Sequence, residues 1–246
     1  MKKPQFIIAA PTSNSGKTTV TLGLLRALEN RGISTQPFKV GPDYIDPKFH
    51  RLASGKEGLN LDLFMMTQED IQSTYSNYSQ DADAVCVEGV MGLFDGAKRS
   101  EKSTAELAKL LDLPIVFVVD AKSVAYSVAP LLYGFKNFDK EVNIAGVIFN
   151  RVNTKSHYKF LEEACEDVGI PSLGHLPLLP DCKIPSRHLG LSIQDMESYS
   201  SVIDQVAKAM EETVHIDELL NLCLVDKKEI IQHPAFMNHP SHYTIA

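Results

Sequence analysis

The sequence of 246 residues lacks the features that mark membrane and secreted proteins. Its longest apolar runs, such as Ile115–Val119, have the length of a strand and fall far short of the roughly 18 residues of a membrane helix. The apolar segment near the N-terminus, Phe6–Ala10, is too short for a signal peptide. We therefore expect a soluble protein without a membrane partner.

Cysteine is also scarce. The four cysteines are far apart and form no C-x-x-C pair, so the sequence indicates neither a zinc site nor a disulfide framework. Such usage fits the reducing cytoplasm. The cysteines are Cys86, Cys165, Cys182 and Cys223.

The chain has no long block of like charge. It contains 24 Lys and Arg against 31 Asp and Glu, a net charge of −7, and both signs are scattered along the sequence. A nucleic-acid partner is therefore not expected. Because 44% of the residues are hydrophobic, the chain is long enough to bury the core of one large α/β domain or two small ones.

Short runs rich in β-branched residues alternate with segments of helical period, which predicts an α/β fold with a mostly parallel central sheet and helices on both faces. Residues 1–225 are expected to form one domain, and residues 226–246, which contain Pro234 and Pro240, are typical of a linker. The predicted strands are 6–10, 35–40, 84–88, 115–119, 144–149 and 172–176. The predicted helices are 17–30, 104–111, 125–136, 155–168, 195–212 and 216–222.

The segment between the first strand and the first helix has the composition of a phosphate-binding loop. Backbone N–H groups at this position would surround a polyphosphate, Lys17 would reach its β and γ oxygens, and the Thr18 hydroxyl would bind Mg²⁺. Pro11 replaces the first glycine of the G-x-x-x-x-G-K-[ST] pattern, and a simple helix cap is the alternative. The expected nucleotide contacts are Thr12, Ser13, Asn14, Ser15, Gly16, Lys17, Thr18 and Thr19.

A cation and two carboxylates follow the second predicted strand. Lys39, Asp43 and Asp46 lie within eight residues, on a segment stiffened by two prolines. Such a segment can hold Mg²⁺-bound phosphates and an acceptor, although glycine, proline and aspartate are also the usual residues of an ordinary turn.

A further carboxylate, Glu88, ends the strand 84–88 and precedes three glycines. A carboxylate that follows a buried strand next to a phosphate loop is the usual position of a Mg²⁺ ligand, and burial without a cation would be costly. Asp95, in the same glycine-rich segment, can add charge or orient the acceptor. A cap on the following turn is the alternative for Glu88.

Polar side chains also follow two later strands. Asn150 and Arg151 follow the strand 144–149, where an amide can recognise an adenine edge, although an ordinary turn is the alternative. Asp120 follows the strand 115–119, and we interpret it as structural.

Together, the segments 12–18, 39–47, 88–96 and 187–191 resemble cobyrinic acid a,c-diamide synthase, a family related to dethiobiotin synthetase. The resemblance runs from about Gln5 to Ser192 and is most specific in VGPDYIDP at 40–47. It implies a P-loop NTPase fold and the ATP-dependent amidation of two acetate carboxylates of a corrin. It also implies phosphate and Mg²⁺ roles for Lys17 and Thr18 and places Asp43, Asp46 and Glu88 around the metals and the transferring phosphoryl group. By the same resemblance, Asp95 joins the catalytic set.

The implied chemistry begins with attack of a substrate carboxylate on the γ-phosphate of ATP, giving an acyl phosphate and ADP, after which ammonia displaces phosphate. Lys17, Lys39 and Mg²⁺ would neutralise the developing charge. A chain of net charge −7 would repel a polycarboxylate corrin unless the pocket is locally basic. Arg187 and His188 are candidates for that role, with a solvated loop as the alternative.

In the family, ammonia comes from glutamine that a second domain hydrolyses with a cysteine nucleophile. None of the four cysteines lies in a suitable tight turn, so we expect a chain without its glutaminase domain, whose first strand would begin near 243–246. A homodimer is compatible with the sequence. The alternatives are a synthase for another tetrapyrrole, such as nickel sirohydrochlorin or hydrogenobyrinic acid, a dethiobiotin synthetase, or a partitioning ATPase.

Overall fold

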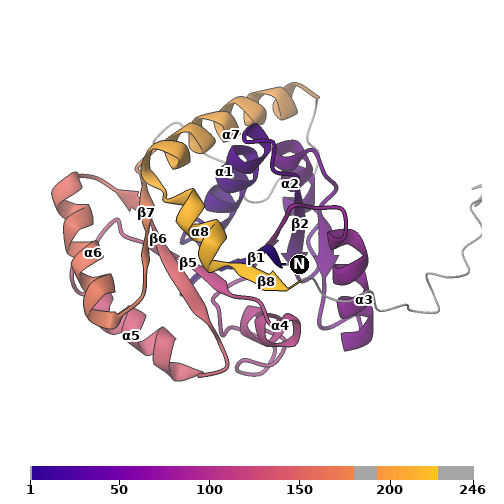
Figure 1. Ribbon diagram of the computed structural model, residues 1–246, viewed down its shortest axis with the longest axis horizontal. Helices are drawn as coiled ribbons and strands as arrows, with labels where there is room; N and C mark the ends of the chain where they lie inside the picture. The colour runs from indigo at the N-terminus through magenta and orange to yellow at the C-terminus, as the bar shows by residue number, and fades with distance from the viewer. Residues whose placement is uncertain (1, 180–192, 227–246) are drawn as a thin grey trace, which may run out of the picture.

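A parallel β-sheet lies between two layers of helices in a computed structural model of the chain (Figure 1), which describes residues 2–179 and 193–226. The strands are β1 (Lys2–Ala9), β2 (Thr35–Val40), β3 (Leu59–Leu61), β4 (Ala84–Glu88), β5 (Ile115–Asp120), β6 (Ile144–Val152), β7 (Ser172–Pro177) and β8 (Leu224–Asp226). The helices are α1 (Lys17–Asn30), α2 (Asp46–Ser54), α3 (Gln68–Ser79), α4 (Thr104–Leu111), α5 (Val128–Phe138), α6 (Lys155–Val168), α7 (Ile193–Thr213) and α8 (Ile216–Leu222).

The strand order β3-β2-β4-β1-β5-β6-β7 brings the first strand to the middle of the sheet. All neighbours along this path are parallel, and only β8 runs antiparallel, pairing Asp226 with Lys2 at the start of β1. The carboxyl ends of β1, β2 and β4 therefore lie side by side at one edge, where ligands bind in open α/β sheets.

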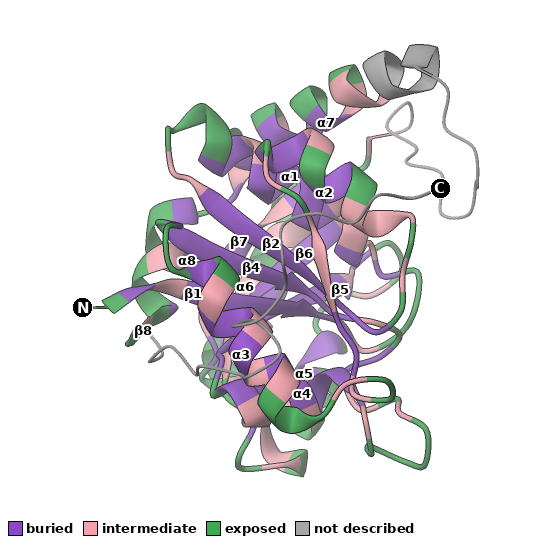
Figure 2. Ribbon diagram, turned by 90° about the vertical axis from the view of Figure 1, so that its right-hand side faces the viewer, coloured by how far each residue is buried: buried purple, intermediate pink, exposed green. Residues whose placement is uncertain are grey.

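Successive side chains along each strand point to opposite faces of the sheet and so belong to two different hydrophobic cores. In β1, Ile7 packs with α3, α4, α5 and α6, whereas Phe6 and Ile8 pack with α1, α2, α7 and α8. Figure 2 shows the buried strands between these helical layers. In β4, Cys86 belongs to the α1 and α2 side, so Glu88, two residues later, points to that same side.

The predicted α/β fold is confirmed, and the structure adds four elements that the sequence did not suggest. Helix α3 is polar along most of its length, and its buried face depends on Ile71 and Tyr75, so its apolar period is weak. Strands β3 and β8 have three residues each, and α2 begins inside the segment 39–47, for which the sequence indicated a loop or an ordinary turn. Strand β8 also extends through Asp226, one residue beyond the expected end of the first domain.

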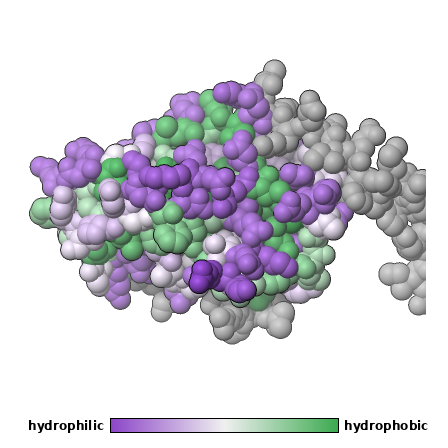
Figure 3. All heavy atoms as spheres, turned by 90° about the horizontal axis from the view of Figure 1, so that it is seen from below, coloured by the Kyte–Doolittle hydropathy of each residue, from purple (hydrophilic) through white to green (hydrophobic). Residues whose placement is uncertain are grey.

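The surface mixes hydrophilic and hydrophobic residues, as the view from below illustrates (Figure 3). Large exposed apolar side chains such as Tyr133, Phe138 and Phe160 are the kind that protein surfaces normally contain singly. Among the described helices, none combines the length and apolar character needed to cross a membrane.

Candidate active site

The loop between β1 and α1 has the shape of a phosphate cradle. Asn14 and Gly16 both have positive φ, 64° and 97°, which turns the backbone before the helix begins. The Ser15 hydroxyl donates to the Thr12 carbonyl at 2.9 Å and fixes the loop, while Ser13 remains exposed. No side chain of the described residues caps α1, so the N–H groups of its first turn, which includes Thr19, remain suited to phosphate oxygens.

Residues at the end of β6 hold this loop from the other side. Asn150 is buried, and its Nδ2 donates to the Ser15 carbonyl at 3.0 Å. A Cβ on Gly16 would lie 1.9 Å from that nitrogen, so the contact requires glycine. Arg151 donates to the Asn14 carbonyl at 3.2 Å and to Asp120 at 2.5 Å. The structure thus gives Asn150 and Arg151 contacts with the loop, and it gives Asp120 the structural role expected of it.

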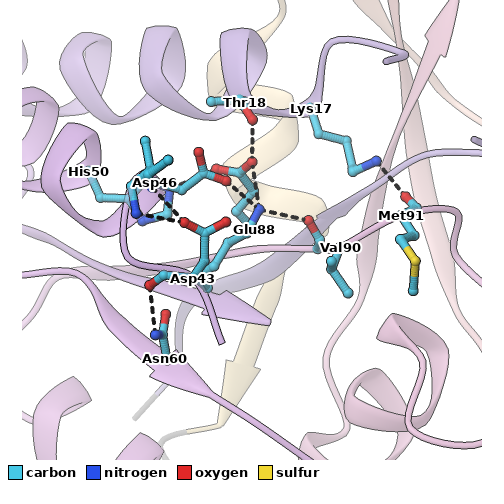
Figure 4. Close-up of polar contacts among 12 residues, drawn as sticks. Lys17, Thr18, Asp43, Asp46, His50, Asn60, Glu88, Val90 and Met91 are labelled. Carbon is cyan, nitrogen blue, oxygen red and sulfur yellow. Dashed lines mark hydrogen bonds and ion pairs between the residues drawn. The ribbon is translucent and has the colours of Figure 1, made fainter. Parts of the chain in front are cut away.

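Lys17 lies in the cradle and reaches across it. Its Nζ donates to the carbonyl of Met91 at 2.5 Å, as Figure 4 shows, and to that of Thr12 at 3.4 Å. Burial lowers the pKa of Lys17 to about 8, although the charge of Glu88 opposes this effect. A phosphate anion in the cradle would favour the protonated amine.

Glu88 is fully buried at the end of β4 and connects the loop to α2. One of its oxygens, Oε1, accepts from the Thr18 hydroxyl at 2.6 Å and from Lys39 Nζ at 3.0 Å. The other, Oε2, lies 2.7 Å from His50 Nε2 (Figure 4). Burial raises the pKa of Glu88, but Lys39, His50 and Thr18 together lower it below its usual range, so this carboxylate is ionised.

Lys39 lies between two carboxylates. It stands opposite Glu88 in the register of β2 and β4, and its Nζ is 2.6 Å from Asp46 Oδ2. Burial lowers the pKa of Lys39, but these two carboxylates raise it above its usual value. For Asp46, burial and the charge of Glu88 raise the pKa to about 6, while Lys39 opposes the increase.

Asp43 organises the turn that leads into α2. Its Oδ1 accepts from the backbone N–H of Ile45 at 2.8 Å and of Asp46 at 2.9 Å, and its carbonyl accepts from Asn60 at 2.8 Å. The helix begins at Asp46, and Pro47 lies in its first turn, where proline is well tolerated. The predicted carboxylates Asp43 and Asp46 are therefore both at the edge where the phosphate loop lies.

Asp95 lies apart from this carboxylate cluster. It is exposed in the loop after β4, where its Oδ2 accepts from the N–H of Gly92 at 2.9 Å. Its charge acts on Lys17, which brings it to the nucleotide side of the site. A Cβ on Gly92 would lie 2.5 Å from the Pro11 carbonyl, so the Asp95 loop and the phosphate loop pack closely.

The donor set suits magnesium. Carboxylate and hydroxyl oxygens of Glu88, Asp46, Asp43 and Thr18 gather at this edge, and hard oxygen donors are what Mg²⁺ prefers. Within the described residues no group of three or more acidic, histidine or cysteine side chains forms a complete metal cage. That arrangement fits an ion held by one or two protein ligands together with phosphates.

His50 is the site residue that the sequence analysis missed. It is fully buried on α2, four residues after Asp46, and its Nδ1 has no hydrogen-bond partner among the described residues. The i, i+4 spacing of Asp46 and His50 places both on one helix face, a signal that depends on recognising α2. The candidates Arg187 and His188, and the expected strand at 243–246, lie outside the described residues.

Similarity to known proteins identifies the family of the chain. Residues 6–191 match the family described as CobQ/CobB/MinD/ParA nucleotide binding domain. The chain is 48% identical over 225 residues to a hydrogenobyrinate a,c-diamide synthase of Brucella ovis, covering 91% of this chain and 52% of that protein. It is 47% identical over 205 residues to a cobyrinate a,c-diamide synthase of Synechococcus sp., covering 82% of this chain and 45% of that protein.

The chain therefore spans about half the length of these curated relatives, and the resemblance stated from its motifs is confirmed. Among solved structures, chloroplast FtsY from Physcomitrella patens is similar with a TM-score of 0.51 and 13% identity, covering 82% of this chain and 66% of that one. At that identity the likeness concerns the fold alone.

Proposed function

The chain belongs to the CobQ/CobB/MinD/ParA nucleotide-binding domain family, and from that membership we propose that it uses ATP to amidate the a and c acetate carboxylates of cobyrinic acid. The observation that carries this proposal is the buried cluster of Lys39, Asp46 and Glu88 in contact with Thr18 of the phosphate loop. Hydrogenobyrinic acid is the second candidate substrate, favoured by the name of the Brucella relative. Nickel sirohydrochlorin is a third tetrapyrrole that a substrate comparison must include.

In the proposed reaction, one oxygen of the substrate carboxylate attacks the γ-phosphorus of ATP in line. The bond from that phosphorus to the bridging oxygen breaks, and ADP leaves with the electron pair. Ammonia then attacks the acyl carbon of the resulting acyl phosphate, inorganic phosphate leaves, and loss of a proton from nitrogen gives the amide. The protein's task in the first step is to hold two anions together, which is chiefly positioning and charge neutralisation.

The residues divide this task between two groups. The first group binds the nucleotide, through the cradle and the first turn of α1: Thr12, Ser13, Asn14, Ser15, Gly16 and Thr19. Asn150 and Arg151 hold this loop in place, and Asn150 also recognises the base. Lys17 contacts the γ-phosphate, and Lys39 keeps Asp46 and Glu88 ionised and in place. Asp43 borders the acceptor, and Asp95 joins the catalytic set from the nucleotide side, where its charge acts on Lys17. Mg²⁺ held by one or two of the candidate ligands Thr18, Glu88, Asp46 and Asp43, together with phosphate oxygens, would neutralise phosphate charge.

We propose that ammonia is produced by a domain other than residues 1–225. Residues 1–225 carry the synthetase site in this proposal, and residues 226–246 link it to a glutaminase domain that hydrolyses glutamine. With free ammonium salts the synthetase site alone is sufficient for amide formation. Glutamine at the same concentration should give no amide with this chain.

The experiment combines the chain with ATP, Mg²⁺, cobyrinic acid and ammonium chloride, and follows ADP and the amide by mass spectrometry. The proposal requires ADP formation that depends on the tetrapyrrole, with one ADP for each amide. A rate of ATP hydrolysis that does not depend on the tetrapyrrole but increases when the chain dimerises would instead indicate a partitioning ATPase. Parallel reactions with hydrogenobyrinic acid and nickel sirohydrochlorin identify the preferred acceptor.

A further inference from the structure

A cavity of about 730 Å³ lies beside the carboxylate cluster, on the outer side of α2. It is bounded by Asp43 and Tyr44 before the helix, by the helix itself, and by Leu59 and Asn60 of the edge strand β3. Two smaller cavities, of about 430 and 260 Å³, lie at α6 and at β8, away from the catalytic carboxylates. Only the first of these three shares a residue with the proposed active site, which is Asp43.

Helix α2 separates this cavity from the catalytic cluster. Asp46 and His50 lie on the face that points to Lys39 and Glu88. Lys48 and Arg51 lie about half a turn around the helix and line the cavity instead. One short helix therefore presents one carboxylate and one histidine to the nucleotide side and two cations to the cavity.

Lys48 and Arg51 are both accessible to an anion from solution. Lys48 is exposed and has no ion pair among the residues that the structure describes. Arg51 pairs with Glu57 at 2.9 Å, but both side chains are 66% exposed. Such an exposed pair contributes little stability, so a ligand carboxylate can replace Glu57 at low cost.

The remaining walls of the cavity combine apolar and acidic side chains. Tyr44, Pro47 and Leu59 are the apolar part. The carboxylates are Asp43, which is held by backbone N–H groups of the following turn, and Glu57, which pairs with Arg51. A ligand that fits must therefore combine a hydrophobic body with an anionic group at its edge. A tetrapyrrole with peripheral carboxylate arms has this composition, and a chain of net charge −7 needs local cations to attract it.

We propose that this cavity binds the edge of the macrocyclic substrate, with Lys48 and Arg51 as the counter-ions of a carboxylate arm that does not react. This inference rests on the proposed function. The cavity borders Asp43, so a macrocycle seated there can extend a different arm around the start of α2 toward the phosphate loop. Lys48 and Arg51 act as binding residues that set affinity and orientation, and neither takes part in phosphoryl transfer.

The test uses the chain with both charges reversed, Lys48→Glu and Arg51→Glu. Binding of cobyrinic acid is measured by equilibrium dialysis, and its KM by ADP formation at saturating ATP. We expect the Kd and the KM for cobyrinic acid each to rise about tenfold or more. The affinity for a fluorescent ATP analogue should stay within twofold of wild type, which also shows that the variant is folded.

The matched control reverses two exposed lysines of α6, Lys155→Glu and Lys159→Glu, and so changes the net charge by the same amount at a distant site. Its KM for cobyrinic acid should change less than threefold. The conservative pair Lys48→Arg and Arg51→Lys should bind as wild type does, because charge rather than identity is required.

The outcomes separate the two proposals. If wild type amidates cobyrinic acid and the cavity variant matches the α6 control, the cavity inference is wrong and the proposed function stands. If wild type neither binds nor amidates any of the tetrapyrroles, both are wrong. A selective increase in Kd and KM for the cavity variant alone supports the inference.

Discussion

The two halves of the site are built in different ways. The nucleotide half consists mainly of backbone groups, and its shape comes from positive φ at Asn14 and Gly16 and from side chains of β6 that hold the loop. The acceptor half consists of buried charges, in which Glu88 has contacts with Thr18, Lys39 and His50 from three other segments.

This difference determines how each half responds to substitution. A backbone cradle tolerates loss of one supporting side chain, because its N–H groups remain. A buried ion cluster does not, because removing one partner leaves the others without compensation. We therefore expect substitutions in the acceptor half to lower both stability and catalysis. Substitutions in the nucleotide half should lower catalysis with little change in stability.

Lys17→Ala should have the largest effect on turnover. It removes the one charged side chain of the cradle, so the γ-phosphate loses its neutralising contact, and we expect a loss of about 10³-fold or more in tetrapyrrole-dependent ADP formation. The unfolding free energy should change by less than about 1 kcal/mol. Urea unfolding and a coupled ADP assay measure the two quantities, and turnover within tenfold of wild type would contradict the assigned role.

Glu88→Gln should affect both activity and stability. It removes the ionised partner of Lys39 and His50 in a fully buried place, so the unfolding free energy should fall by about 3 kcal/mol. Turnover should fall about 10²-fold or more. An unfolding curve that matches wild type would show that the stability of the cluster does not depend on this charge. It would also contradict the difference in stability effects that we expect between the two halves.

Asp46→Asn should spare nucleotide binding but slow phosphoryl transfer, by about 10²-fold. The carboxylate lies 2.6 Å from Lys39 and its isostere keeps the shape of the turn. Single-turnover measurements with cobyrinic acid isolate this step from ATP affinity. Unchanged turnover would remove Asp46 from the mechanism.

His50→Gln should reduce turnover about tenfold, because the amide keeps a donor for Glu88 without reproducing the imidazole. The matched comparison is His157→Gln, whose ring contacts the carbonyl of Val124 far from the acceptor half. Equal activity of the two variants would mean that His50 is only a packing residue.

Asn150→Ala should have the smallest effect, a rise of about threefold to tenfold in the KM for ATP. The affinity for GTP distinguishes the two roles of this side chain. Equal weakening of ATP and GTP indicates loop support alone through Ser15. Selective weakening of ATP adds the predicted contact with adenine.

The sequence predicted the nucleotide half better than the acceptor half, for a physical reason. The cradle is one contiguous segment between a buried strand and a helix, so residues 12–19 reveal it directly. The acceptor half is assembled from β2, β4 and α2, and the ionic contacts of Lys39 follow from strand register, which short sequence patterns do not specify. His50 was missed because Asp46 and Pro47 suggested a turn where a helix begins.

In the proposed reaction a substrate carboxylate becomes an acyl phosphate at this site. Cobyrinic acid labelled with ¹⁸O in its carboxylates, together with unlabelled ATP, water and ammonium chloride, tests this step directly. We expect one ¹⁸O atom in the inorganic phosphate for every amide formed, because the carboxylate oxygen remains bonded to phosphorus when ammonia displaces the phosphate from the acyl carbon. Phosphate without label, formed alongside the amide, would rule out the acyl phosphate.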